Sequence, residues 1–256
     1  MELDIPLVGF APATRWDEPF YEPWIPEEFR PQSIFSETRT VIVIGLPVSL
    51  PVLETAPSIY YHELYRTVNT HLDVSGYRIS MVLNSLLLPS IWIPRDGYGS
   101  ISILKEKPIA FFSHRHAAFL AGLGNFGINN MLLTEKYGPR VRFASIFTAA
   151  DIPPDPVLQK PLCTSCMQCV TSCPVKALEG RQYPQGLTDK KACAIRSEAL
   201  LKRFISPCGL CIKVCPVGKD RDLYKRDDDA IYVDKDRFAN YHKAWKHVRS
   251  YGGKNL

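Results

Sequence analysis

The chain has 256 residues, of which 46% are hydrophobic and 22% charged, and its formal net charge is +5. These values are ordinary for a water-soluble protein with one large domain, or with a medium domain and a small one. No apolar run approaches the roughly 20 residues of a membrane-spanning helix, and the N-terminus lacks the features of a secretion signal. We therefore expect a cytoplasmic protein with no membrane partner. The modest positive charge does not call for a nucleic-acid partner, and none is expected.

Residues 1–38 contain six of the 21 prolines and seven aromatic side chains. Proline removes a backbone donor and disfavours helix interiors and central strands, so no regular helix or strand is expected here. Exposed aromatic side chains in such number are unusual. The sequence therefore predicts an extended arm over residues 1–38 that lies on the globular body.

The region 39–150 alternates strand-like and helix-like segments. Residues 40–45 are a short β-branched run and predict a buried strand, and residues 58–74 repeat apolar side chains on one helical face. Gly76 stands where a C-terminal glycine would end that helix, and residues 77–83 are taken as a second strand. Residues 86–94 are apolar but interrupted by prolines.

Further along, Ser113 is placed to cap a helix over residues 114–123. A glycine-rich loop follows, and then two strands at 131–134 and 141–148, joined by a turn at 135–139. The proline-rich segment 151–156 predicts a stiff linker and a domain boundary. After a charged stretch at 219–229, residues 236–251 predict an amphipathic helix that packs on its own chain.

All eight cysteines lie between Cys163 and Cys215. The first four have the spacing C-x2-C-x2-C-x3-C and precede Pro174; Cys193 then stands alone before a C-x2-C-x3-C run that precedes Pro216. This is the ligand pattern of two 4Fe–4S clusters in a bacterial-ferredoxin arrangement, in which the last cysteine of each run binds the other cluster.

On that logic the eight cysteines divide into two sets of four. The first set is Cys163, Cys166, Cys169 and Cys215, and the second set is Cys173, Cys193, Cys208 and Cys211. A zinc site would leave several of these cysteines unexplained, and disulfides suit small secreted scaffolds. We therefore predict two clusters and an electron-transfer role.

The glycines Gly122, Gly124 and Gly127 have the spacing of a dinucleotide-binding fingerprint. They follow a predicted helix rather than a strand, which argues against NAD. Glycines let the backbone come close to a large flat ligand, but a plain structural turn is an equal alternative from spacing alone.

The glycines belong to a longer segment that resembles a motif of known protein families. Residues 121–142 read AGLGNFGINNMLLTEKYGPRVR. This resembles the motif of corrinoid-dependent reductive dehalogenases and is similar to the corresponding part of epoxyqueuosine reductase. In both families a two-cluster ferredoxin domain follows, as the cysteines predict here. The resemblance covers about residues 40–217.

The resemblance implies an α/β (α+β) fold: a nitroreductase-like α/β sandwich over residues 39–150 that binds cobalamin in the base-off form, then a small ferredoxin-like domain over residues 151–220. A charged segment with the amphipathic helix would complete the chain at 221–256. Residues carried over to the corrinoid site are Gly122, Gly124, Asn125, Gly127, Asn129, Asn130, Tyr137, Gly138 and Arg140.

One departure concerns the proton donor. Epoxyqueuosine reductases carry an aspartate about 13 residues before the AGLG alanine, and the matching position here is Pro108. Candidates for moving a proton are His114 and His116, because histidine titrates near neutral pH, and Tyr98 in a glycine-flanked turn. A buried, hydrogen-bonded structural histidine is the commoner outcome for such residues.

These observations predict a cobalamin-dependent iron–sulfur reductase. A low-potential donor such as a ferredoxin or flavodoxin would reduce the clusters, and the corrinoid would reduce a small organic substrate. The alternative is an electron-transfer protein, or a reductase that reactivates the corrinoid of a partner protein. The chain could also form a homodimer.

Overall fold

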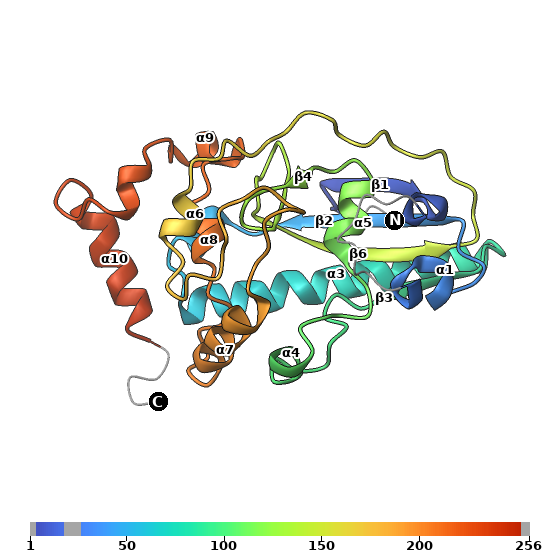
Figure 1. Cartoon of the computed structure of the whole chain (residues 1–256), viewed down its shortest axis with the longest axis horizontal. Coiled ribbons are helices and arrows are strands. Elements are labelled where there is room, and N and C mark those ends of the chain that lie inside the picture. The colour runs from blue at the N-terminus through green and yellow to red at the C-terminus, as the bar shows by residue number, and fades with distance from the viewer. Residues whose placement is uncertain (1–3, 18–26, 252–256) are drawn as a thin grey trace.

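A computed structural model describes residues 4–17 and 27–251. The fold is mixed α/β, with a four-stranded antiparallel sheet of order β1-β2-β6-β3 at one end and the cysteine-bearing segment at the other (Figure 1). The sheet strands are β1 (Leu7–Pro12), β2 (Thr40–Pro47), β3 (Ser90–Ile93) and β6 (Val141–Thr148), and a separate pair joins β4 (Asn125–Phe126) and β5 (Leu132–Leu133).

The helices differ greatly in length. They are α1 (Pro31–Ile34), α2 (Leu50–Leu53), α3 (Ile59–Ser85), α4 (Ile103–Glu106), α5 (His114–Leu120), α6 (Gln168–Thr171), α7 (Lys190–Leu201), α8 (Leu210–Lys213), α9 (Asp220–Tyr224) and α10 (Ala239–Arg249). Three 3-10 turns span Ala13–Trp16, Glu27–Phe29 and Asp229–Tyr232. None of the helices within the described ranges is both long and apolar enough to cross a bilayer.

The predicted strand at 40–45 is confirmed as β2, which is buried on both faces. Val41 and Val43 belong to the core that packs against α5, while Ile42 and Ile44 belong to the core that packs against α3. Alternating side chains point to opposite faces of a strand, so one β-branched run supplies both cores. The sheet is therefore covered by α5 on one face and α3 on the other.

The N-terminal region is more regular than predicted. Residues 7–12 form β1, an edge strand paired antiparallel with β2, so the expectation of no regular structure is wrong. An edge strand tolerates proline, and Pro12 ends this one. Trp16 is buried against Phe112, so at least this aromatic side chain packs on the body as predicted. Residues 18–26 of the predicted arm lie outside the described residues.

Helix α3 begins where predicted, with the Ser58 hydroxyl accepting from the Tyr61 amide, but continues to Ser85. The predicted strand at 77–83 is therefore wrong. Gly76 does not end the helix: a Cβ there would lie 2.8 Å from the Trp92 side chain, so this glycine permits close packing of β3 on α3. Ile79 and Leu83, four residues apart, pack on the sheet and favour the helical period.

The region after α3 follows the prediction in part. Ser113 caps α5, and β6 matches the predicted strand at 141–148. β5 pairs with β4 of the glycine-rich loop, at Asn125 and Phe126. The segment after β6 then runs beside β1, because Asp155 and Phe10 exchange hydrogen bonds of 2.9 and 3.0 Å.

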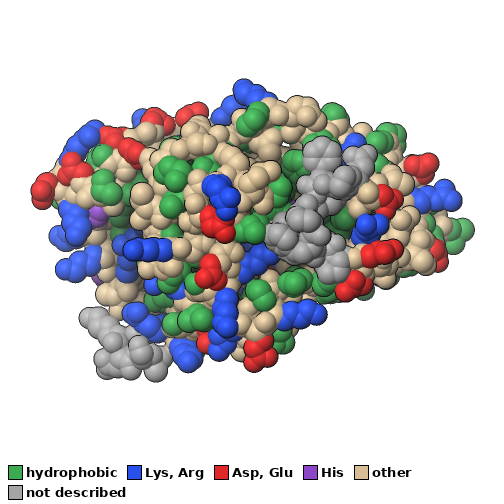
Figure 2. All heavy atoms as spheres, in the orientation of Figure 1, with side chains coloured by type: hydrophobic (Ala, Val, Ile, Leu, Met, Phe, Trp, Pro, Cys, Tyr) green, Lys and Arg blue, Asp and Glu red, His purple; other side chains and the backbone are tan. Residues whose placement is uncertain are grey.

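The C-terminal segment packs on the rest of the chain, as predicted for the amphipathic helix. Trp245 of α10 is buried, and Arg249 donates to the carbonyls of Thr55 and Glu54 near α2. Glu54, itself fully buried, also accepts from Arg226. Basic and acidic side chains are interspersed over the face shown in Figure 2.

Candidate functional site

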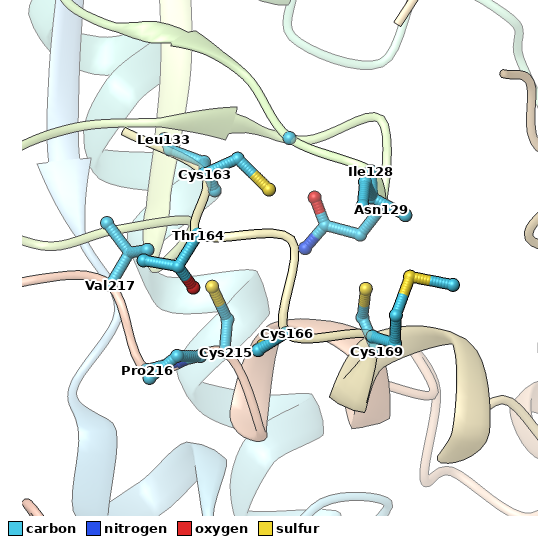
Figure 3. A pocket seen from close by; sticks show the side chains of 12 residues that line it. Ile128, Asn129, Leu133, Cys163, Thr164, Cys166, Cys169, Cys215, Pro216 and Val217 are labelled. Carbon is cyan, nitrogen blue, oxygen red and sulfur yellow. The ribbon is translucent and has the colours of Figure 1, made fainter. Parts of the chain in front are cut away.

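The first cysteine set lines one pocket. Cys163, Cys166, Cys169 and Cys215 border about 320 Å³ of empty space, together with residues 127–129 of the glycine-rich loop. The sulfurs of Cys163, Cys169 and Cys215 and the side-chain amide of Asn129 face this space (Figure 3). The three N-terminal thiols are therefore joined by a thiol 46 residues beyond Cys169, as cross-ligation requires.

The second set gathers around Cys211. Burial raises the pKa of the Cys211 thiol, and the nearby thiols Cys193 and Cys208, then Cys169 of the first set and Cys173, add to the rise. Cys193 lies on α7, Cys208 precedes Gly209, and Cys211 lies in the first turn of α8. The structure therefore brings together the second predicted set as well.

The donor set fits two clusters. All eight cysteines are free thiols. Within the described residues no three His, Cys, Asp or Glu side chains are arranged to hold one metal ion. Thiolates of a 4Fe–4S cluster bind different corners of a cube and do not have to meet at one ion. Burial also raises the pKa of the Cys169 thiol to about 11, so iron must displace a proton there.

A buried arginine fixes the chain around Cys215. Arg140 is fully buried and forms a bidentate ion pair with Asp220, with N–O distances of 2.6 and 2.7 Å. It also donates to the carbonyls of Cys215 and Val217, at 3.1 and 2.6 Å. Arg140 thus connects the start of β6 to the cysteine-bearing segment, rather than facing an open cavity.

The glycines carried over to the corrinoid site lie against the protein itself. A Cβ on Gly122 would lie 2.2 Å from the Pro156 carbonyl oxygen, and one on Gly124 would lie 1.9 Å from that of Leu133. A Cβ on Gly138 would lie 1.9 Å from the Val217 carbonyl oxygen. Close approach does require glycine here, but the approaching group is backbone rather than a flat ligand.

The other carried-over residues also bind the chain. Asn125 bonds the backbone of residues 158–162, and Asn130 donates to the Gly186 carbonyl at 3.0 Å. Tyr137 packs on the core beside α5. Gly127 and Asn129 are the exceptions in position, because both border the first cysteine set, and Asn129 also donates to the Cys211 carbonyl at 3.3 Å.

Both candidate histidines are neutral; His116 is buried and His114 is half-buried. His114 Nε2 donates to the Pro94 carbonyl at 3.1 Å, so Nδ1 accepts from the Ser145 hydroxyl at 2.9 Å, and burial lowers its pKa to about 4. Burial lowers the pKa of His116 to about 3, and its ring contacts Ser113 and the Tyr183 hydroxyl, at 2.6 and 2.5 Å. Both therefore match the structural alternative.

Tyr98 lies in a polar group that the sequence did not reveal. Burial raises its pKa, and neighbouring Tyr65 and Asp96 add to the rise while Arg142 opposes it. Arg142 donates to Asn69 and Asp96, at 3.1 and 3.4 Å, and lies over the Tyr65 ring. These residues come from α3, β6 and the turn after β3, so no local motif could have united them.

The comparisons with known proteins agree with these observations. Residues 162–219 match the 4Fe–4S dicluster domain, which implies two 4Fe–4S clusters. The chain is 25% identical over 197 residues to tetrachloroethene reductive dehalogenase of Desulfitobacterium hafniense, covering 71% of this chain and 33% of that protein. It is 26% identical over 218 residues to epoxyqueuosine reductase of Listeria monocytogenes, covering 82% and 56%. The chain thus spans one third to about half of these relatives.

Solved structures share the fold. A catabolic reductive dehalogenase superposes with a TM-score of 0.62 at 18% identity, covering 97% of this chain and 36% of that one. An epoxyqueuosine reductase with a tRNA stem loop gives 0.56 at 20% identity, covering 90% and 67%. A further reductive dehalogenase, described as B12-dependent, gives 0.53 at 19% identity, covering 96% and 34%. The chain is therefore related to two groups of oxidoreductases, the reductive dehalogenases and the epoxyqueuosine reductases.

Proposed function

We propose that the chain is an iron–sulfur reductase that takes single electrons from a low-potential donor and passes them through two clusters to a corrinoid-dependent reduction of an organic substrate. The single observation that supports this most is the position of Asn129. It belongs to the segment that resembles corrinoid reductases, borders the first cysteine set, and donates to the backbone of the second. The resemblance segment thus adjoins both predicted clusters.

The chain's part in electron transfer is positioning. Arg140 and Asp220 hold the backbone at Cys215, and Asn129 holds the backbone at Cys211. These contacts fix two cysteines that come from the same C-x2-C-x3-C run but belong to different sets. Fixed geometry and a partly enclosed site are what a protein contributes to a redox cofactor.

We propose Tyr98 as the proton source. A tyrosine phenol is protonated at neutral pH, and Arg142 beside it can stabilise the phenolate that forms when the proton leaves, which opposes the rise in pKa that burial causes. His114 and His116 suit this role less, because each is neutral with both ring nitrogens in contact with a partner.

A bound corrinoid would supply the low-valent cobalt that reduces the substrate. The carried-over residues do not fit it as direct contacts, because most of them bind the chain's own backbone. We therefore assign no step through it. The nitroreductase-like sandwich remains our prediction for residues 39–150, with the cytoplasm as the predicted compartment.

The test is anaerobic purification with hydroxocobalamin and reconstitution with iron and sulfide. We expect about eight irons per chain, corrinoid retained through gel filtration, and turnover with a low-potential reductant. Tetrachloroethene and an epoxyqueuosine-containing tRNA stem loop are the first substrates, since they belong to the relatives. Tyr98→Phe should lower turnover by about 10²-fold or more with unchanged iron content. An unchanged rate in that variant would remove Tyr98 as proton source.

In the alternative function the chain still binds two clusters but does not itself reduce a small organic substrate. A chain that takes up about eight irons and no corrinoid, yet reduces the corrinoid of an added partner protein, would be an electron-transfer or reactivating protein. Retained corrinoid together with substrate turnover would instead support the reductase function.

A further inference from the structure

One charged side chain reaches a cysteine sulfur. Arg196 lies on α7 three residues after Cys193, and residues three apart share a helix face. Its Nε donates to the Sγ of Cys208 at 3.2 Å. Arg196 therefore connects two cysteines of the second set, one through its helix and the other through its side chain.

The first set has no equivalent contact among the described residues. Near its sulfurs at Cys169 and Cys215, the backbone amides of Val170 and Val217 oppose the rise in pKa that burial causes. The buried Arg140 donates to the carbonyl of Cys215 instead of its sulfur, and Asp220 neutralises its charge. The second set also receives a backbone amide bond, from Ala177 to the Cys173 sulfur at 3.3 Å, so what distinguishes it is the additional cationic donor Arg196.

The charge of Arg196 is not neutralised by a carboxylate in the described part of the chain. Glu198, two residues further on α7, is paired with Lys105 at 2.9 Å. Two further positive groups lie near the second set: Arg115 acts on Cys193, and Lys213, which also interacts with Glu54, acts on Cys208. Reduction would add a negative charge close to the guanidinium of Arg196.

We propose that Arg196 is a redox-tuning residue that raises the reduction potential of the cluster held by Cys173, Cys193, Cys208 and Cys211. A cationic N–H donor stabilises the form of a cluster that carries one more electron, and hydrogen bonds to the ligand sulfurs are a known determinant of cluster potential. The electron comes from a low-potential one-electron donor, and no covalent bond changes. The inference rests on the two clusters of the proposed function but not on the corrinoid.

The experiment is a redox titration of the reconstituted full chain, without corrinoid, followed by EPR of the reduced clusters. Arg196→Gln removes the charge. We expect the reduction equilibrium of one cluster to weaken about tenfold, which is a fall of about 59 mV for a one-electron couple, while the other cluster keeps its midpoint. Arg196→Lys should fall by less. The control is Lys202→Gln, which removes an exposed charge at the end of the same helix and should move neither midpoint.

Equal shifts of both clusters, or no shift, in Arg196→Gln would overturn the proposal. If that variant loses iron from about eight to about four per chain, the midpoint of Arg196→Lys becomes the test. The lysine variant keeps a cation but not the guanidinium N–H. A lowered midpoint in the lysine variant then supports the sulfur contact, and an unchanged midpoint contradicts it. Failure of the corrinoid function would appear elsewhere, as absent corrinoid uptake with both cluster midpoints measurable.

Discussion

At the scale of single residues, burial decides which titratable groups can act. His114 and His116 look suited to proton transfer by sequence, since an ordinary histidine titrates near neutral pH. Their rings lie between the sheet and its neighbours, where burial lowers their pKa values to about 4 and about 3. A neutral ring with hydrogen-bonded nitrogens orders its surroundings, so we assign both residues to stability.

This assignment predicts acid sensitivity. In the unfolded chain each histidine binds a proton below about pH 6.5. In the folded chain His114 binds one only below about pH 4 and His116 only below about pH 3. The free energy of unfolding is therefore highest above about pH 6.5 and falls as the pH drops. Each histidine should cost about 2 kcal/mol between pH 7 and pH 5. Thermal unfolding of the anaerobic holoprotein, followed by circular dichroism, should show a smaller pH effect in His114→Gln.

The control for the pH effect is His71→Gln, which changes an exposed histidine of α3. It should leave the pH dependence as in the unchanged chain. If His114→Gln and His71→Gln behave alike, His114 is not held neutral by the fold.

At the scale of elements, contacts close in sequence could be predicted and distant ones could not. Ser113 caps its helix as expected, because a cap needs only residues two or three positions away, and α3 begins next to Ser58 as predicted. β1 was missed because it exists only by pairing with β2, some 30 residues later. Gly76 was taken for a helix end because its partner, Trp92, lies on another element.

The same limit explains the site. The two sets of cysteines follow from spacing, since cluster ligands obey a fixed pattern. Arg196 could have been found from its place three residues after Cys193, but the target of its side chain, Cys208, comes from a separate loop. The roles of the glycines could not be predicted either, because their spacing does not distinguish close approach by the backbone from close approach by a ligand.

Gly76 gives a prediction at this scale. Gly76→Ala gains about 1 kcal/mol of helix propensity, but the new Cβ would lie 2.8 Å from the rigid Trp92 ring. Overpacking of a buried contact costs about 1–3 kcal/mol, so we expect net destabilisation by about 1 kcal/mol. Thr70→Ala, at an exposed position of the same helix, should instead stabilise by a few tenths of a kcal/mol. Both variants are compared by thermal unfolding, and a more stable Gly76→Ala would show that α3 and β3 can separate without cost.

At the scale of the whole molecule, the sheet and the cysteine-bearing segment are joined by buried polar contacts. Arg140 pairs with Asp220 across 80 residues of sequence, and Asn130 donates to Gly186 across 56. The C-terminal segment closes over α2 through Arg226 and Arg249, which reach Glu54. The arrangement of the cysteines therefore depends on residues of the sheet region as much as on their own loops.

Arg140 is the most direct test of that dependence. Arg140→Met would leave the Asp220 carboxylate buried without its cation, and breaking a buried ion pair in this way costs about 3–5 kcal/mol. It would also release the carbonyls of Cys215 and Val217, so we expect iron to fall from about eight toward about four per chain, with loss of the cluster that Cys215 completes. Asp220→Asn should weaken the same anchor, while Lys136→Gln, on the exposed turn before Arg140, should leave iron content and melting temperature unchanged. Iron analysis and thermal unfolding measure both effects. Full iron content in Arg140→Met would mean that Cys215 is positioned by its own loop alone, and that contacts from the sheet are not needed to position the cluster ligands.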